Sequence, residues 1–186
     1  MGNFLALLAE IRRGIESGAL SQAEAAHYVS QRMCRVFHCA RASIWTAQGV
    51  QVSRLGGYDA LACRPLTELA ELVGANLGKR LVTLTRPGIL VSEDVMADDR
   101  LECVRDKYLA PHSVTSVLAA PLRFNGVISG VVCLESVGAL RKWQTSEIAK
   151  LKSFANSISL RKARAAVSRR ELSGLSRPGL GEGRLV

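Results

Sequence analysis

The pair Asn125-Gly126 constrains the fold more than any other feature, because it joins two long runs of β-forming residues, 113–123 and 127–137. Asn-Gly is the preferred pair for a two-residue hairpin turn, which needs a positive φ at both positions. The second run is apolar on both of its alternating faces, with Val127, Val131 and Cys133 on one and Ile128, Val132 and Leu134 on the other. The pattern predicts an antiparallel hairpin inside a sheet that is covered on both faces.

Other segments predict the elements around this hairpin. Ser21 and Glu24 have the spacing of a capping box, which indicates a helix from there to about residue 38. Branched and aromatic residues predict strands at 41–47 and 50–55, the second ended by Gly56-Gly57. Residue spacing further predicts a mostly helical 66–84, a strand at 89–94, a short helix at about 99–109 and a long helix from about 145 to 171. This order predicts an α+β domain with a mostly antiparallel sheet.

The chain divides into four parts on composition. Apolar residues on one face of 3–17 predict an N-terminal helix in residues 1–19, for packing or dimerisation. The domain itself occupies residues 20–160. A basic helical extension follows in 161–172, and the Gly- and Pro-containing residues 173–186 are expected to form a disordered tail.

Positive charge is concentrated near the C-terminal end. Residues 141–186 hold 11 Lys/Arg and 3 Asp/Glu, whereas residues 1–140 hold 14 and 13. The basic segment 161–170 lacks interleaved aromatic residues, and no helix-turn-helix pattern is visible. We therefore expect a solvated or coiled helix that leads out of the domain, and not a nucleic-acid-binding protein. Docking of nucleic acid or of an effector on this helix remains an alternative.

The cysteines indicate a reducing compartment. The chain has an odd number of them, five, with no CxxC pair and no secretion signal, which predicts reduced thiols in a cytoplasmic protein. No apolar run approaches the ~20 residues that a membrane-spanning helix needs. Cys34, His38 and Cys39 come nearest to metal-ligand spacing, but the chain offers no obvious fourth ligand. We expect no metal, and buried thiols that act as small hydrophobes.

Two segments carry a resemblance to a known family. ILVSEDVMADDRL, 89–101, resembles the strand-Asp-loop segment of GAF domains, with Asp94, Asp98 and Arg100 on matching positions and Asp99 where Pro is usual. Residues 107–143 resemble the family's stretch from a Tyr-Leu helix end to its Gly-containing hairpin, and W-x-x-x-E opens the last helix. Residues 20–58 fit the family's first helix and hairpin more loosely.

This resemblance implies a GAF-like α+β fold with a central six-stranded antiparallel sheet. It implies terminal helices on one face, often paired in a homodimer, and a ligand pocket under short helices on the other. For this chain the dimer helices would be 3–17 and 145–170. We find no signature of covalent bilin attachment, of haem or of tight cyclic-nucleotide binding, so the cofactor or ligand is unknown.

The candidate ligand-binding residues are polar, aromatic and thiol side chains of the pocket side. They are Trp45, Asp94, Arg100, Cys103, Tyr108, Ser116, Cys133 and Glu135. Several have plain structural alternatives. Trp45 suits a core, and an aspartate near residue 98 suits a helix N-cap.

Cys133 and Glu135 lie two residues apart on one strand face, about 6–7 Å from each other. That separation is too large for direct proton transfer, so we do not expect a catalytic dyad. Glu135 either pairs with Arg141, Arg123 or a backbone group at the sheet end, or it contacts a cationic or hydroxylic ligand.

The function expected from these features is that of a non-catalytic sensory domain, of a bacterial-type regulator, that binds a small molecule or a partner and signals through its terminal helices. The enzymatic alternative is a thiol-based reductase that resembles free methionine sulfoxide reductase and uses Cys103.

Overall fold

The computed structural model of the chain describes residues 17–48, 51–66, 71–73, 88–124 and 126–158, together with residues 9, 13, 83 and 85. The first helix that the structure describes over its full length is α2 (Gln22–Phe37). The strands are β1 (Arg41–Gln48), β2 (Gln51–Asp59), β3 (Arg64–Pro65), β4 (Glu71–Val73), β5 (Leu90–Ser92), β6 (Val114–Phe124) and β7 (Val127–Val137). Residues 145–158 form the last described helix. The expected helix at 3–17 and the basic segment 161–172 lie almost wholly outside these residues.

One antiparallel sheet contains all the described strands. Its order is β3-β2-β1-β7-β6-β5, and β4 pairs with β2 beside this path. The predicted α+β fold with its six-stranded antiparallel sheet is confirmed, with β4 as one short addition. Phe124 lies opposite Val127, so β6 and β7 form the hairpin predicted from Asn125-Gly126.

Helix α2 begins where its capping box predicts. The Ser21 hydroxyl accepts from the Glu24 N–H, and the Glu24 carboxylate accepts from the Ser21 N–H at 2.8 Å. The helix ends at His38, which adopts a left-handed conformation with a φ of 49°. These contacts satisfy backbone groups that the helix ends leave without partners.

Two expectations for the chain after β1 are wrong. Gly56-Gly57 does not end the strand, because β2 continues to Asp59. The glycine is there for packing, since a Cβ at Gly56 would lie 2.7 Å from the Cβ of Ala26 on α2. Residues 71–73, expected to be helical, form β4, because they pair with the exposed edge of β2.

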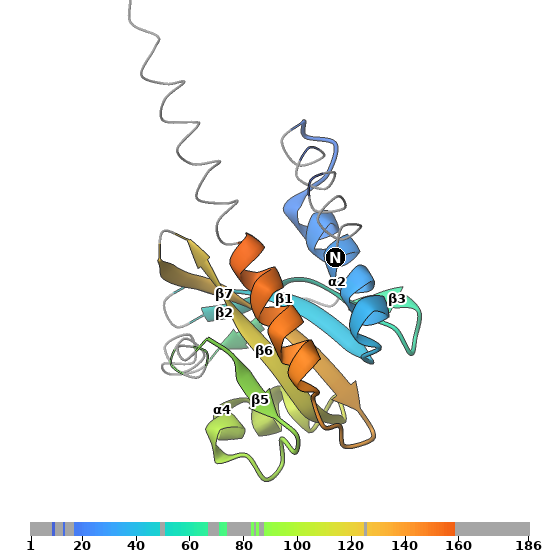
Figure 1. Ribbon diagram of the computed structural model, residues 1–186, viewed down its shortest axis with the longest axis vertical. Helices are drawn as coiled ribbons and strands as arrows, with labels where there is room; N and C mark the ends of the chain where they lie inside the picture. The colour runs from blue at the N-terminus through green and yellow to red at the C-terminus, as the bar shows by residue number, and fades with distance from the viewer. Residues whose placement is uncertain are drawn as a thin grey trace, which may run out of the picture.

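The terminal helices cover one face of the sheet. Figure 1 shows α2 and helix 145–158 on the same side of β1, β6 and β7. Met33 from α2 and Leu151 from the last helix are fully buried there, against Leu118 and Leu134 of the sheet. Burying such side chains contributes about 1.5–3 kcal/mol each, so this layer is the main core.

Short helical turns cover the opposite face. The single helix expected at 99–109 is instead a 3₁₀ turn η1 (Asp99–Leu101), an α-turn α4 (Glu102–Val104) and a π-helical turn η2 (Arg105–Leu109). These turns and the sheet enclose a second apolar cluster, which contains Trp45, Tyr108 and Val131 among others. Among the described residues, no helix is long and apolar enough to span a bilayer.

Arg141 ties the two helices of the first face together. After β7 the chain turns at Gly138, whose φ is 79°. The Arg141 guanidinium then donates to the carbonyls of Phe37 and His38, both at 2.7 Å, and to the Glu147 carboxylate at 2.5 Å. It also lies 4.4 Å from the ring centroid of Trp143. We call this set of contacts the Arg141 clamp.

Candidate functional site

A cavity of about 60 Å³ lies between the sheet and the short turns. Its wall is largely apolar, and its polar groups include one carboxylate, one phenol, one aliphatic hydroxyl and one thiol. The lining residues are Trp45, Val52, Thr85, Leu90, Leu101, Val104, Tyr108, Leu109, Val117, Ala119, Val131, Cys133 and Glu135. Such a hollow, with few polar groups in an apolar wall, is the usual form of a small-molecule site.

Glu135 is the buried acid of this cavity. Its strand β7 is central, and alternation along the strand points residues 131, 133 and 135 to the cavity face. The side chain is only 2% exposed. The Tyr108 hydroxyl lies 3.1 and 3.2 Å from its two carboxylate oxygens and donates to them. The π-helical turn η2 brings Tyr108 to this position.

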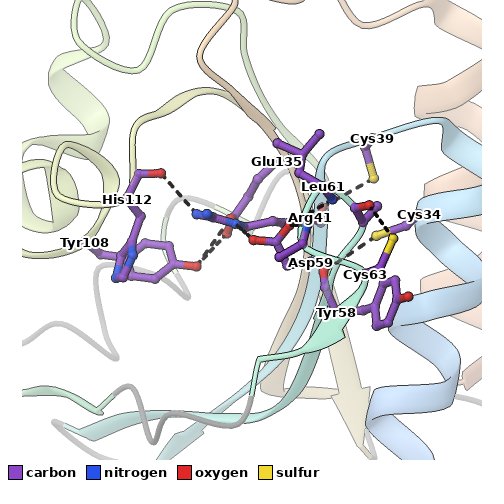
Figure 2. A network of polar contacts seen from close by, with 12 residues as sticks. Cys34, Cys39, Arg41, Tyr58, Asp59, Leu61, Cys63, Tyr108, His112 and Glu135 are labelled. Carbon is purple, nitrogen blue, oxygen red and sulfur yellow. Dashed lines mark hydrogen bonds and ion pairs between the residues drawn. The ribbon is translucent and has the colours of Figure 1, made fainter.

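The nearest cation in the sheet is already engaged. Arg41 lies directly opposite Glu135 in the pairing of β1 with β7, and opposite Asp59 in the pairing with β2. Its guanidinium donates to the Asp59 carboxylate at 2.7 Å and to the His112 carbonyl at 3.0 Å. Figure 2 shows this network, with Tyr108 turned toward Glu135 and Arg41 toward Asp59.

Burial raises the pKa of Glu135 from 4.5 to about 6, although the Tyr108 hydrogen bond and the charges of Arg41 and Arg54 act against the shift. Burial, and the neighbouring Glu135 charge, also raise the pKa values of Tyr108 and Cys133. Both of these groups therefore remain protonated at neutral pH, whereas Glu135 changes charge just below it.

Aromatic rings line the cavity beside this acid. The Trp45 and Tyr108 rings meet edge to face, with centroids 5.3 Å apart. The Trp45 indole N–H donates to the Ser43 hydroxyl at 2.8 Å, which fixes the ring. The Arg54 guanidinium carbon lies 5.6 Å from the Trp45 ring centroid. The site thus combines a carboxylate with two aromatic side chains.

The sequence model of the GAF domain matches residues 23–161, most of the chain. The chain belongs to the GAF domain family.

Solved structures agree with this family at the level of the fold. The GAF domain of PixJ from Thermosynechococcus elongatus, in its blue-light-absorbing form, is 18% identical with a TM-score of 0.70, over 81% of this chain and 89% of that one. GAF3 of Slr1393 from Synechocystis sp. PCC6803 is 20% identical with a TM-score of 0.63, over 76% and 93%. A phycocyanobilin-bound GAF domain of a cyanobacterial phytochrome is 13% identical with a TM-score of 0.62, over 89% and 96%. No curated protein matches the chain.

The cavity of this GAF domain brings together half of the candidate ligand-binding residues. Trp45, Tyr108, Cys133 and Glu135 line it. That they bind a ligand stays a prediction. The alternative in which Glu135 pairs with Arg141 or Arg123 is wrong. The turn at Gly138 carries Arg141 to the helix-covered face, and Arg123 lies opposite Ile128, far along the strand from Glu135.

The other four candidates lie outside the cavity wall. The Asp94 carboxylate accepts from the Met96 and Ala97 N–H groups and shapes the loop. Arg100 pairs with Asp98 at 2.7 Å. Cys103 is half-buried against the second apolar cluster. Ser116 is fully buried, where it donates to the Glu93 carbonyl and accepts from the Arg141 N–H.

Sequence reasoning missed most of the apolar wall and the Arg41–Asp59 pair. Each of these wall residues also suits an ordinary core, and they come from six separate elements: Val52, Leu90, Leu101, Val104, Leu109, Val117 and Ala119. Strand alternation in β6 and β7 is the sequence signal that could have placed Val117 and Val131 in the wall. The pair of Arg41 with Asp59 depends on the register of β1 with β2.

We predict that Glu135 makes this GAF domain less stable as pH rises. A carboxyl whose pKa is higher in the folded than in the unfolded protein holds its proton more tightly when folded, so its stabilising effect is lost as pH rises from about 4.5 through 6. The loss is about 2 kcal/mol. Urea unfolding of the wild type and Glu135→Gln across this range should show their difference changing by that amount. A difference that stays constant with pH contradicts the prediction.

Proposed function

We propose that this GAF domain is a sensory module without catalytic activity that binds a small molecule in the described cavity and signals through its terminal helices. One observation carries the proposal. The buried Glu135–Tyr108 pair sits in the wall of a largely apolar cavity. A carboxylate in such a place costs stability unless a partner compensates it, so its presence suits ligand recognition better than folding.

The size of the cavity limits the ligand. A water molecule needs roughly 10–15 Å³ of such space, so about 60 Å³ suits a molecule of only about five non-hydrogen atoms. A tetrapyrrole such as the phycocyanobilin of the cyanobacterial phytochrome neighbour is far larger. The described cavity does not fit that group, and we propose a small metabolite instead.

The proposed signal crosses the sheet. Glu135 faces the cavity, and its neighbour Leu134 faces the helices within the same strand. Ser116 offers a second route, since it bonds both the Glu93 carbonyl beside the 94–109 segment and the backbone of Arg141. A ligand that favours one arrangement of 94–109 thereby shifts the packing of the Arg141 clamp. The proposal includes a homodimer through helices 3–17 and 145–170.

Native mass spectrometry of the protein purified from its own host tests the ligand-binding part. We expect a co-purified mass that is lost on Glu135→Leu, with the fold retained by circular dichroism. Hydrogen exchange then tests the signal, because ligand addition should change protection in residues 145–158. A cavity that binds nothing from a broad metabolite set overturns the proposal. A chain that sediments as a monomer at high micromolar concentration removes the dimer from it.

A further inference from the structure

We propose that the cavity selects a small organic cation, a protonated amine with a short apolar body. This inference rests on the proposed function and names the chemical class of its ligand. It depends on which hydrogen-bond donors and which cations contact the Glu135 carboxylate.

Glu135 is under-supplied with hydrogen-bond donors. An ionised carboxylate has about four acceptor positions. Among the described residues, the Tyr108 hydroxyl is the one donor to Glu135, shared between both oxygens. A buried charge without a paired countercharge is costly, so the site favours an occupant that brings both N–H donors and a positive charge.

The neighbouring cations do not fill this role. Arg41 is the closest in register, but its guanidinium is bonded to Asp59 and to the His112 carbonyl. Arg54 acts on Glu135 through space while its guanidinium lies over the Trp45 ring. Asp59, Arg41 and Glu135 lie side by side across β2, β1 and β7, and Arg41 gives its hydrogen bonds to Asp59 and not to Glu135.

The rest of the wall suits the body of an amine. The Trp45 and Tyr108 rings, which pack edge to face, offer apolar contact to such a body. The remaining lining is aliphatic, with Val104, Val117 and Val131 among its members. A neutral alcohol of the same shape gains the same apolar contacts and one hydrogen bond, but it leaves the carboxylate charge uncompensated.

A matched set of probes tests the charge preference. Isobutylamine, isobutanol and isobutyrate share one short branched body, and about five or six non-hydrogen atoms suit the cavity. Binding to the full chain is followed by NMR titration near pH 7.5, to concentrations on the order of 50 mM, because so small a ligand binds weakly. We expect isobutylamine to bind at least about tenfold more tightly than isobutanol, with no binding of isobutyrate.

Variants assign this preference to Glu135. In Glu135→Gln, which keeps the shape and removes the charge, the amine should lose its advantage over the alcohol. Cys133→Ala is the matched control, because it changes an uncharged side chain of the same strand and the same wall. It should alter both affinities and leave their ratio unchanged. Tyr108→Phe removes the hydrogen bond that lowers the pKa of Glu135. Glu135 is therefore ionised only at higher pH in this variant, and the amine preference should appear only there.

The pH profile gives a readout that a purely structural role of Glu135 would not. With a Glu135 pKa of about 6, amine affinity should fall about tenfold between about pH 7.5 and 5, and alcohol affinity should not. The other groups that face the acid keep their charge over this range. Tyr108 and Cys133 stay neutral, and Asp59 stays ionised because its N–H contacts and Arg41 outweigh the effect of burial. His112 packs on Tyr108. Its effect on the pH profile is the same in Glu135→Gln, so comparison of the wild type with this variant removes it.

The outcomes separate the proposed ligand class from the proposed function. Equal affinity for isobutanol and isobutylamine, or an amine preference that survives in Glu135→Gln, overturns the ligand class but leaves a small-molecule sensor standing. Failure of all three probes, together with no binding from a metabolite set, removes the proposed function as well.

Discussion

Gly130→Ala is expected to lower the free energy of unfolding by about 3 kcal/mol or more. A Cβ at Gly130 would overlap the carbonyl oxygen of Trp45. That atom belongs to the backbone of β1, and Gly130 pairs there with Thr46. Relief requires β1 and β7, two adjacent inner strands of the sheet, to separate where they pair.

Urea unfolding followed by circular dichroism measures this effect. For a chain of this size the loss corresponds to a melting temperature lower by roughly 6–12 °C. Ser129→Ala is the control, because it changes the adjacent residue and removes only a 3.4 Å hydrogen bond to the Leu122 carbonyl. We expect it to stay within about 0.5 kcal/mol of wild type. Equal unfolding midpoints for the two variants would show that the strands have room at Gly130.

Arg141→Ala is the second large effect, with an expected loss of about 3 kcal/mol. The variant removes charge-assisted bonds to the carbonyls of Phe37 and His38, the ion pair with Glu147, and the contact with Trp143. Each charge-assisted bond contributes roughly 1.5–3 kcal/mol, and the partial exposure of the guanidinium reduces the sum. Because the clamp joins α2 to helix 145–158, both should lose hydrogen-exchange protection together.

The matched control is Arg35→Ala, which removes an exposed arginine from the last turn of α2. It should change stability by less than about 0.5 kcal/mol. Arg141→Lys should recover only part of the loss, because an ammonium cannot reach two carbonyls and a carboxylate with the planar fork of a guanidinium. An Arg141→Ala protein as stable as Arg35→Ala would mean that the clamp does not hold the helices.

The sequence predicted the fold correctly where interactions between residues close in the chain decide the structure. The capping box at Ser21 and the Asn-Gly turn before Val127 act within a few residues, and both are where the sequence indicates. The two apolar faces of β7 likewise predict a covered sheet. The expectations for residues 71–73 and for Gly56 are wrong for the opposite reason. Their structure depends on a partner distant in the chain, the edge of β2 for one and α2 for the other.

The candidate site divides in the same way. Strand alternation places Cys133 and Glu135 on one face from the sequence alone. The contact between Tyr108 and Glu135 could not be predicted, because the 99–109 segment changes from 3₁₀ to α to π geometry and follows no single helical period. Arg141 was assigned to the wrong partner because one turn at Gly138 decides which face of the sheet it reaches.

The placement of Cys133 gives the cavity a chemical reporter of its own. Of the five thiols, Cys63 is exposed, Cys34 and Cys39 are buried with the helix layer, and Cys133 lines the cavity. Its raised pKa makes alkylation slow, and that slow rate is useful. A molecule that fills the cavity shields the Cys133 sulfur, while Cys63 continues to react. The ratio of the two labelling rates, read by mass spectrometry, therefore measures occupancy without any knowledge of what the occupant is.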